Sequence, residues 1–223
     1  DVFSFLTRLE GIPFPEAATR LAEQAGVEIE AADPAQDAER KRRRRREERL
    51  VELVDVAAGF FIEQLARHPN AHLGRTMCDE RGLTQETVAK FRLGYAPDEW
   101  DGLTNHLRQR GFALEDAEAV GLIVPRRGGS GYYDRFRHRL MFPIADHQGR
   151  IVAFSGRILP ALRDDGREPG AKYINSPEGP LYTKGEVLFG LHEGRVAIRR
   201  TGQCVICEGN FDLVKLHQAG VEN

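Results

Sequence analysis

The 223-residue chain has no apolar run near the roughly 20 residues needed to cross a bilayer, and its first residues lack the pattern of a signal peptide. It has only three cysteines, an odd number, which fits a reducing cytosol better than a disulfide framework. It also lacks an excess of positive charge, because 32 basic and 34 acidic residues give a net charge of −2. Any surface for nucleic acid must therefore be local. These absences predict a cytoplasmic globular protein of one or two domains.

Apolar residues recur at helical spacing through most of the first 120 residues, and shorter β-rich runs follow them. Gly11 and Gly26 end the first two helical segments, and Thr84 is a suitable N-cap for a later one. The expected helices span residues 2–9, 14–25, 50–65, 84–93, 103–110 and 114–120; the expected strands span 122–125, 140–144 and 151–155, with an exposed loop at 161–170.

Residues 31–49 are charged and poor in apolar side chains, and they contain an almost continuous basic run from Arg40 to Arg46. One interpretation is a solvated linker or helix face, which is the usual role of such a run. The other is a non-specific contact with the phosphate groups of nucleic acid. The run alone leaves both interpretations open.

Arg135, Arg137 and Arg139 alternate along a segment that leads into an expected strand. Side chains two residues apart lie on the same face of a strand, so the spacing predicts a row of three guanidinium groups. Such a row suits a sugar-phosphate backbone, because each guanidinium offers a planar fork of hydrogen-bond donors. The alternative is an edge strand that its charges protect from pairing.

The sequence Lys172-Tyr173-Ile174-Asn175 combines three side chains that suit a nucleotide. Lysine can meet a triphosphate, tyrosine can stack or donate a hydrogen bond, and asparagine can bond a sugar or a phosphate. The alternative is an exposed strand end, because the Asn-Ser-Pro that closes this segment is an ordinary turn signal.

A short apolar run at residues 204–207 has the length and β-branched composition of a strand, and it leads into Glu208 and Gly209. Asp212 follows four residues after Glu208, where a helix begins. Open α/β sheets place their ligand chemistry at the carboxyl ends of strands, and two carboxylates on such a turn suit a hard cation such as Mg²⁺. The alternative is an ordinary capped helix start with Asp212 near its first turn.

Cys204 and Cys207 have the spacing of a zinc-binding or redox pair. Within a strand, however, residues three apart face opposite ways. No second Cys or His pair at ligand spacing accompanies them in the sequence. We therefore expect two buried thiols that pack as small apolar side chains.

Residues 203–220 resemble the first acidic motif of the Toprim domain, in the form found in bacterial DnaG-type primases. Four spaced motifs that resemble one family in the same order are far more specific than any one of them. The chain departs from the family at Asn210-Phe211, where Tyr-Met normally follows Glu-Gly, and we expect metal binding to tolerate this change. The upstream motifs are Tyr133 to Ile144, Phe154 to Arg157, Lys172 to Glu178, and Lys184-Gly185.

The resemblance implies a DNA primase, a nucleotidyltransferase that makes short RNA primers on single-stranded DNA by two-metal phosphoryl transfer. It implies a Mg²⁺ (or Mn²⁺) site, with Zn²⁺ held only by a domain upstream of Asp1. The implied partners are the template, NTPs, the RNA primer, and a replicative helicase bound through a missing C-terminal domain. By their places in the motifs, Glu208 and Asp212 are the catalytic metal ligands, Arg81, Arg135, Arg137 and Arg157 contact template, and Lys172, Tyr173, Asn175 and Lys184 contact nucleotide.

The fold class that the resemblance implies is α/β, with an α+β basic subdomain followed by the first strand and helix of a Toprim α/β domain. The implied divisions are the tail of a zinc-binding domain (1–31), a charged linker (32–49), the basic subdomain of the catalytic core (50–198) and a truncated Toprim start (199–223). The second acidic motif, Asp-x-Asp, would lie beyond Asn223, so this chain alone is expected to be nearly inactive. Two alternatives stay open: a nucleic-acid-binding module without catalysis, and another Toprim protein such as a phage primase-helicase. The expected location is cytoplasmic, at replication forks in the nucleoid.

Overall fold

The computed structural model describes residues 1–27, 34–161 and 170–223, which form two compact units, Asp1–Arg44 and Arg45–Asn223. Residues 162–169 of the loop predicted at 161–170, and the predicted domain boundary at residues 31 and 32, lie outside the described residues. None of the described helices is long and apolar enough to cross a membrane.

The first unit contains helices α1 (Val2–Glu10) and α2 (Phe14–Ala25), as the apolar spacing predicts. Asp1 caps α1, because its carboxylate accepts a hydrogen bond from the backbone N–H of Ser4 at 2.8 Å. Gly11 ends α1 with a φ of 67°, a left-handed conformation that glycine adopts without strain. Ala17 is the one fully buried side chain among the described residues of this unit, so the helix pair has little core of its own.

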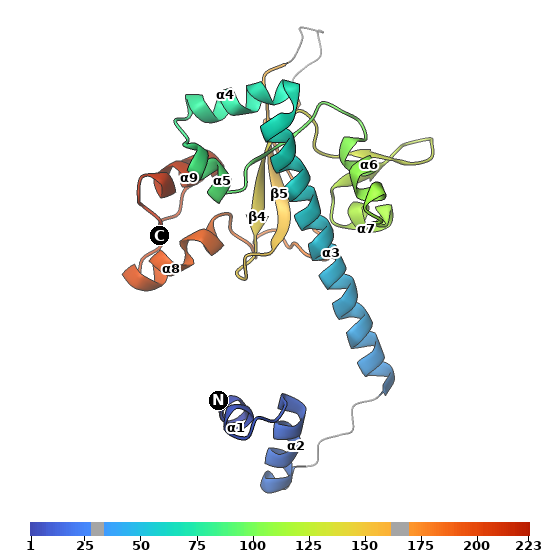
Figure 1. The fold of residues 1–223 in the computed structure, drawn as a ribbon, viewed down its shortest axis with the longest axis vertical. Helices are drawn as coiled ribbons and strands as arrows, with labels where there is room; N and C mark the ends of the chain where they lie inside the picture. The colour runs from blue at the N-terminus through green and yellow to red at the C-terminus, as the bar shows by residue number, and fades with distance from the viewer. Residues whose placement is uncertain (28–33, 162–169) are drawn as a thin grey trace. The chain divides into compact units, whose positions relative to one another are not determined.

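A four-stranded antiparallel sheet forms the centre of the second unit, in the order β1-β4-β5-β6 (Figure 1). The central strand β4 is buried along its whole length, because strands pair with it on both sides. The three strands predicted from the sequence are confirmed. The strands are β1 (Gly94–Ala96), β4 (Arg139–Ala145), β5 (Ile151–Ile158) and β6 (Tyr173–Asn175), and a separate two-stranded sheet joins β2 (Ile123–Pro125) to β3 (Tyr132–Asp134).

Helices surround this sheet, and those predicted from apolar spacing are confirmed. Thr84 is the N-cap of α5, since its hydroxyl accepts a hydrogen bond from the backbone N–H of Thr87 at 3.2 Å. The helices are α3 (Pro34–Arg67), the 3₁₀ turn η1 (Pro69–Ala71), α4 (His72–Glu80), α5 (Gln85–Lys90), α6 (Gly102–Gln109), α7 (Leu114–Ala119), α8 (Leu191–Thr201) and α9 (Asn210–Gln218).

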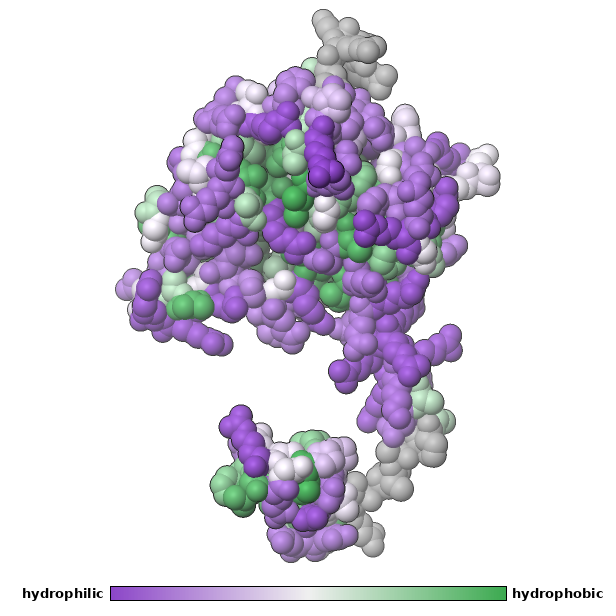
Figure 2. All heavy atoms as spheres, in the orientation of Figure 1, coloured by the Kyte–Doolittle hydropathy of each residue, from purple (hydrophilic) through white to green (hydrophobic). Residues whose placement is uncertain are grey.

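The sheet buries apolar side chains on both faces, because successive residues of a strand point to opposite sides. On one face, the rings of Phe154 and Phe61 of α3 meet edge to face at 5.4 Å. On the other face, Phe142 meets Phe211 of α9 at 5.1 Å. Truncating a buried phenylalanine to alanine costs about 3–5 kcal/mol, so each layer contributes substantially to stability. Figure 2 shows hydrophilic side chains over most of the visible surface of this unit, with apolar ones between them near its centre.

Residues 204–207 do not form the strand that their composition predicts. They have no regular secondary structure, and Ile206 is 82% exposed. A strand needs a neighbour to pair with its backbone groups. Within the described residues this segment makes a single backbone–backbone hydrogen bond, from the N–H of Val205 to the carbonyl of Asn223 at 3.1 Å. The β-branched composition therefore predicts a strand, but the described residues provide no neighbouring strand with which this segment could pair.

Asp146 holds the turn between β4 and β5. Its carboxylate accepts hydrogen bonds from the backbone N–H groups of Gln148 at 2.9 Å and Arg150 at 3.0 Å, and from Nε of Arg150 at 2.7 Å. Burial raises the pKa of Asp146, but these hydrogen bonds and the charge of Arg150 together hold the pKa below its usual value. Asp146 therefore stabilises the fold in its ionised form.

Replacing Asp146 with alanine should lower the free energy of unfolding at neutral pH by about 1–3 kcal/mol, because three donors lose their acceptor. The pKa is lower in the folded than in the unfolded state. The contribution is therefore present above the unfolded pKa of about 4 and is lost as the pH falls through the folded value. Urea unfolding of both proteins at neutral pH and near pH 3 measures the difference, which should shrink in acid. A difference that stays constant contradicts this account of the turn.

Candidate nucleic-acid and nucleotide site

Arg157 of β5 and Tyr173 of β6 lie opposite each other at the edge of the four-stranded sheet. The Arg157 guanidinium lies 5.2 Å from the centroid of the Tyr173 ring, which is within the range of a cation–π contact. On its other side Arg157 pairs with Leu140, which is fully buried. The half-buried arginine therefore lies where the hydrophobic layer gives way to the surface.

Arg81, the residue after α4, brings a second guanidinium to the same region. It lies 4.9 Å from the centroid of the Phe211 ring in α9. Burial raises the pKa of Tyr173, while the charges of Arg157 and Arg81 lower it and that of Asp212 raises it. Arg157 contacts the Tyr173 ring, and Arg81 contacts Phe211, the neighbour of Asp212 in α9. Arg81, Arg157, Tyr173 and Asp212 are therefore called the polar cluster below.

Helix α9 is fixed against the turn between α4 and α5. Nζ of Lys215 and Nε2 of Gln218 both donate to the carbonyl of Gly82 at 2.8 Å, and the N–H of Thr84 donates to Oε1 of Gln218 at 2.8 Å. Gly82 has a φ of 64°, which favours glycine at this turn. These bonds place the helix that carries one member of the polar cluster beside the turn that carries another.

Glu208 and Asp212 are exposed, Glu208 just before α9 and Asp212 in the first turn of that helix. The Asp212 carboxylate lies over Gly209, where an added side chain would collide with its Oδ2 atom. Gly209 occupies the N-cap position, and no side chain makes a capping hydrogen bond there. The position of Asp212 thus agrees with an ordinary helix start, yet capping does not use its carboxylate.

The two carboxylates match part of a divalent-cation site. Carboxylate oxygens are the ligands that Mg²⁺ takes from proteins. Within the described ranges, no group of three or more His, Cys, Asp or Glu side chains could hold a metal ion. Glu208 and Asp212 therefore fit as two ligands of such an ion and do not form a complete site.

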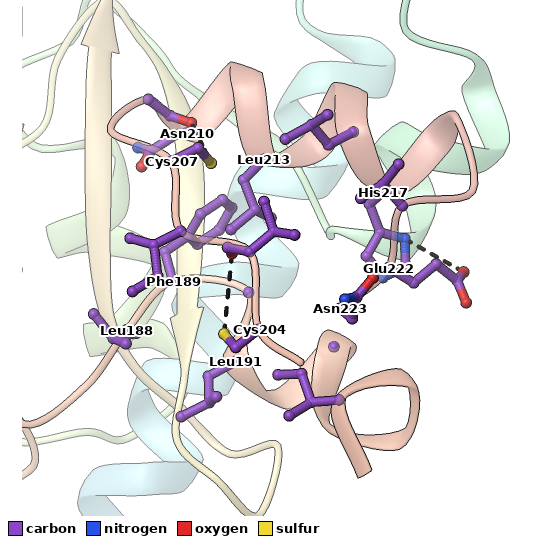
Figure 3. Close-up of a pocket in the computed structure, with 18 of the residues that line it drawn as sticks. Leu188, Phe189, Leu191, Cys204, Cys207, Asn210, Leu213, His217, Glu222 and Asn223 are labelled. Carbon is purple, nitrogen blue, oxygen red and sulfur yellow. Dashed lines mark hydrogen bonds and ion pairs between the residues drawn. The ribbon is translucent and has the colours of Figure 1, made fainter. Parts of the chain in front are cut away.

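A cavity of about 240 Å³ lies between α8, the segment 204–209 and α9 (Figure 3). Its lining includes Phe189, Leu213 and the buried His217, and it contains no lysine or arginine. Without a lysine or arginine the cavity offers no permanent positive charge to a phosphate group, and none of the residues predicted to contact nucleotide lines it. Cys204 and Cys207 also line it, the first exposed and the second half-buried. The predicted burial of both thiols is wrong, because the segment that carries them is not covered as a paired strand would be.

The predicted row of three arginines is also wrong. Strand β3 ends at Asp134 and β4 begins at Arg139, so the residues between them are not in a strand. His138 has a φ of 51°, which turns the backbone just before β4. The period of two holds only along a continuous strand. Arg135, Arg137 and Arg139 consequently have three different environments.

Arg139 is a structural residue. It is 6% exposed, and its Nη1 donates to the carbonyls of Gly156 at 2.9 Å and Ala171 at 3.0 Å. Arg137 lies over the Trp100 ring, with 4.3 Å between the guanidinium carbon and the ring centroid. Arg135 is half-buried, and its Nε has no hydrogen-bond partner in the described part of the chain. The template roles of Arg135 and Arg137 remain predictions.

Three further residues are predicted to contact nucleotide: Lys172, Asn175 and Lys184. Asn175 lies on the same face of the sheet as Tyr173, two residues along β6, and is exposed. Lys172 directly precedes β6 and is also exposed. Lys184 lies in a turn, where its backbone N–H donates to Oε1 of Glu178 at 3.3 Å. No side-chain contact in the described ranges joins Lys184 to the polar cluster, so its role remains a prediction.

Comparison with known proteins places this geometry in a family. Residues 60–195 match the family described as "DNA primase catalytic core, N-terminal domain". A DNA primase of Synechococcus elongatus is 43% identical over 220 residues, covering 98% of this chain and 31% of that protein. The RNA polymerase domain of Mycobacterium tuberculosis primase DnaG, in complex with a double-stranded DNA oligomer with a 6-nucleotide overhang, matches with a TM-score of 0.72. That match has 38% identity and covers 78% of this chain and 52% of that one.

A second solved structure matches along the whole chain. The zinc-binding and RNA polymerase domains of Aquifex aeolicus primase are 30% identical, with a TM-score of 0.68, over 100% of this chain and 50% of that one. Because the family match covers more than half of the chain, the chain belongs to the DNA primase catalytic core family, N-terminal domain. This confirms the resemblance seen in the spaced motifs and the mixed helix-and-sheet fold class. The chain spans about a third of the length of the curated relatives that it matches.

Proposed function

We propose that this chain is part of a DNA primase, an enzyme that synthesises short RNA primers on single-stranded DNA by nucleotidyl transfer. The observation that carries the proposal is the polar cluster, in which two guanidinium groups, a tyrosine and a carboxylate come together from separate elements of a chain in this family. The Mycobacterium tuberculosis relative in complex with DNA supports nucleic acid as the ligand.

In this proposal Arg81 and Arg157 bind phosphate groups of the template. Each guanidinium lies over an aromatic ring, which orients its plane while its N–H edge stays able to donate. Arg135 and Arg137 extend the template contact, and Arg137 is oriented by Trp100 in the same way.

The nucleotide is proposed to lie at the β6 edge of the sheet. Tyr173, which is 37% exposed, offers a ring face for stacking and a hydroxyl for a phosphate. Asn175, on the same face, can bond a sugar or phosphate, and the exposed lysines Lys172 and Lys184 supply charge for the triphosphate.

Glu208 and Asp212 would hold Mg²⁺ or Mn²⁺ together with ligands from outside these 223 residues. A divalent pair, when bound, stabilises the charge that develops on the transferred phosphoryl group. The contribution of this chain is to hold two carboxylates beside the arginines that bind phosphate. We therefore expect the chain by itself to incorporate almost no nucleotide.

Further assignments concern the longer protein. Residues 1–31 would be the tail of a zinc-binding domain, residues 32–49 a charged linker, residues 50–198 the basic subdomain and residues 199–223 the start of a Toprim domain. Zn²⁺ binding, recruitment by a replicative helicase and location at the nucleoid would be properties of that protein. A second candidate function is nucleic-acid binding without synthesis, because the guanidinium groups of Arg81 and Arg157 can bind phosphate without a metal ion.

Incorporation of labelled ribonucleotides by the full-length protein on single-stranded DNA separates the two candidates. Primer synthesis predicts short RNA products that require the template, all four NTPs and a divalent ion. DNA binding without any RNA product supports the second candidate. Neither binding nor product contradicts both.

A further inference from the structure

We infer that the basic segment Arg40–Arg46 of α3 is a second nucleic-acid-binding surface, which holds the phosphate groups of a strand by charge rather than by shape. This inference rests on the proposed function, because it adds a contact with the same class of ligand. The segment lies outside the family match at residues 60–195 and belongs to a different element from every member of the polar cluster.

The basic segment is cationic on every side of its helix. An α-helix turns about 100° per residue, so seven consecutive residues point in all directions around the axis. All seven residues of the segment are exposed, and it contains no apolar side chain. The N-terminal part of α3 is correspondingly purple in Figure 2. The segment is therefore not the solvated side of a helix whose other side is buried.

Most of these cations have no side-chain partner among the residues that the structure describes. The side chains of five residues make no hydrogen bond or ion pair with any described residue: Arg40, Lys41, Arg42, Arg43 and Arg45. Arg46 has one distant contact, with 3.7 Å between its Nη2 and Oδ1 of Asp116. The glutamate that follows the segment, Glu47, lies 3.3 Å from Arg150 instead. The described residues thus leave most of this positive charge available to an external anion.

The spacing of these charges works against the helix that carries them. Residues three and four apart on a helix are neighbours, and like charges at those spacings repel. Arg40 and Arg44, Lys41 and Arg45, and Arg42 and Arg46 are such pairs. A chain whose net charge is −2 nevertheless gathers seven cations here. A bound polyanion relieves the repulsion and releases the counterions that the segment and the strand had condensed.

The chemistry favours nucleic acid over a membrane. A helix that lies on a bilayer inserts an apolar face, and the basic segment has none. Seven residues of helix rise about 10 Å. Duplex DNA carries one charge per roughly 1.7 Å of axis, so this length spans several phosphates.

The test compares two variants of the full chain that lose the same charge. The first is Arg40→Gln/Lys41→Gln/Arg42→Gln/Arg43→Gln, which keeps good helix formers and removes no observed contact of the fold. The control is Arg67→Gln/Arg108→Gln/Arg195→Gln/Arg199→Gln, four exposed arginines on α3, α6 and α8. Binding of labelled oligothymidylate and of a labelled DNA duplex is measured by fluorescence anisotropy across a salt series without metal or NTPs, and circular dichroism checks that helix content is kept.

The first variant should lose about 0.7 in the slope of log K against log salt for each contact to a single strand, or about 0.9 for each contact to a duplex. Four lost contacts therefore lower the slope by about 2.8 for the single strand or about 3.6 for the duplex. The control should keep the slope of the parent. A smaller slope with only one of the two DNA forms supports the inference and shows whether the basic segment binds single-stranded or duplex DNA. An unchanged slope with both forms overturns it. Because no nucleotide is incorporated in this assay, primer synthesis can succeed or fail independently of either result.

Discussion

Replacing Glu208 with glutamine should lower nucleotide incorporation by the full-length protein about a thousandfold or more and leave its melting temperature unchanged. Losing a metal ligand removes several kcal/mol of charge stabilisation in the transition state, and about 4 kcal/mol corresponds to a thousandfold. The fold should tolerate the change, because Glu208 is exposed and makes no hydrogen bond or ion pair with the described residues. Asp212→Asn should have a similar effect on incorporation.

Glu186→Gln is the matched control. Glu186 is also an exposed carboxylate, it lies between β6 and α9 in the sequence, and it is not part of the polar cluster. It should keep full activity. Single-turnover incorporation at saturating template measures the chemical step directly. Activity within about tenfold of the parent in both Glu208→Gln and Asp212→Asn contradicts their assignment as metal ligands.

Replacing Asp134 with alanine should lower the free energy of unfolding by about 3–5 kcal/mol, which corresponds to roughly 6–20 °C in melting temperature for a chain of this size. Asp134, at the end of β3, is 5% exposed. Its carboxylate accepts hydrogen bonds from the N–H groups of Leu103 at 2.8 Å and Thr104 at 2.9 Å, and from the Thr104 hydroxyl at 2.6 Å. Truncation leaves three buried donors without an acceptor.

Asp101→Ala is the control for this prediction. Asp101 stands at the N-cap position of α6, yet its side chain makes no capping hydrogen bond. Asp134 satisfies the first turn of α6 from another element instead. The change at Asp101 should therefore alter stability by less than about 0.5 kcal/mol. Equal melting temperatures for the two alanine variants contradict the assignment of the cap to Asp134.

The sequence predicts α6 from its apolar spacing, but it does not identify the residue that caps it. A local rule selects Asp101, because capping aspartates usually directly precede their helix. The observed acceptor lies 30 residues further along the chain, so only the packing of β3 against α6 reveals it. The same limit applies to Arg139, whose carbonyl partners come from β5 and from the residues before β6.

The predicted helices and the strands predicted at 122–125, 140–144 and 151–155 hold because their apolar patterns match the faces that the core buries. The arginine row and the strand at 204–207 fail for a shared reason: both assume a continuous strand, and a strand depends on partners that local sequence does not specify. The backbone turns at His138, whose φ is 51°, so the arginines do not share one strand. The segment 204–207 is irregular because its backbone makes a single backbone–backbone hydrogen bond with the described residues.

The polar cluster was predicted residue by residue through motif resemblance, whereas no spacing rule brings its members together. Arg81 directly follows α4, whereas Arg157, Tyr173 and Asp212 come from β5, β6 and α9. One available signal was missed. Phe211, Lys215 and Gln218 follow the i, i+4, i+7 spacing of one helix face, and this is the face that holds α9 against its neighbours.

The most direct test of the central claim measures how Arg81→Ala/Arg157→Ala binds single-stranded DNA across a salt series. The control is Arg108→Ala/Arg110→Ala, which changes two exposed arginines at the C-terminal end of α6. Fluorescence anisotropy should show weaker binding in the first variant and a slope of log K against log salt smaller by about 1.4, since each phosphate contact to a single strand contributes about 0.7. The control should match the parent. A parental slope and affinity in Arg81→Ala/Arg157→Ala, with the fold intact, would contradict the assignment of the polar cluster to the template.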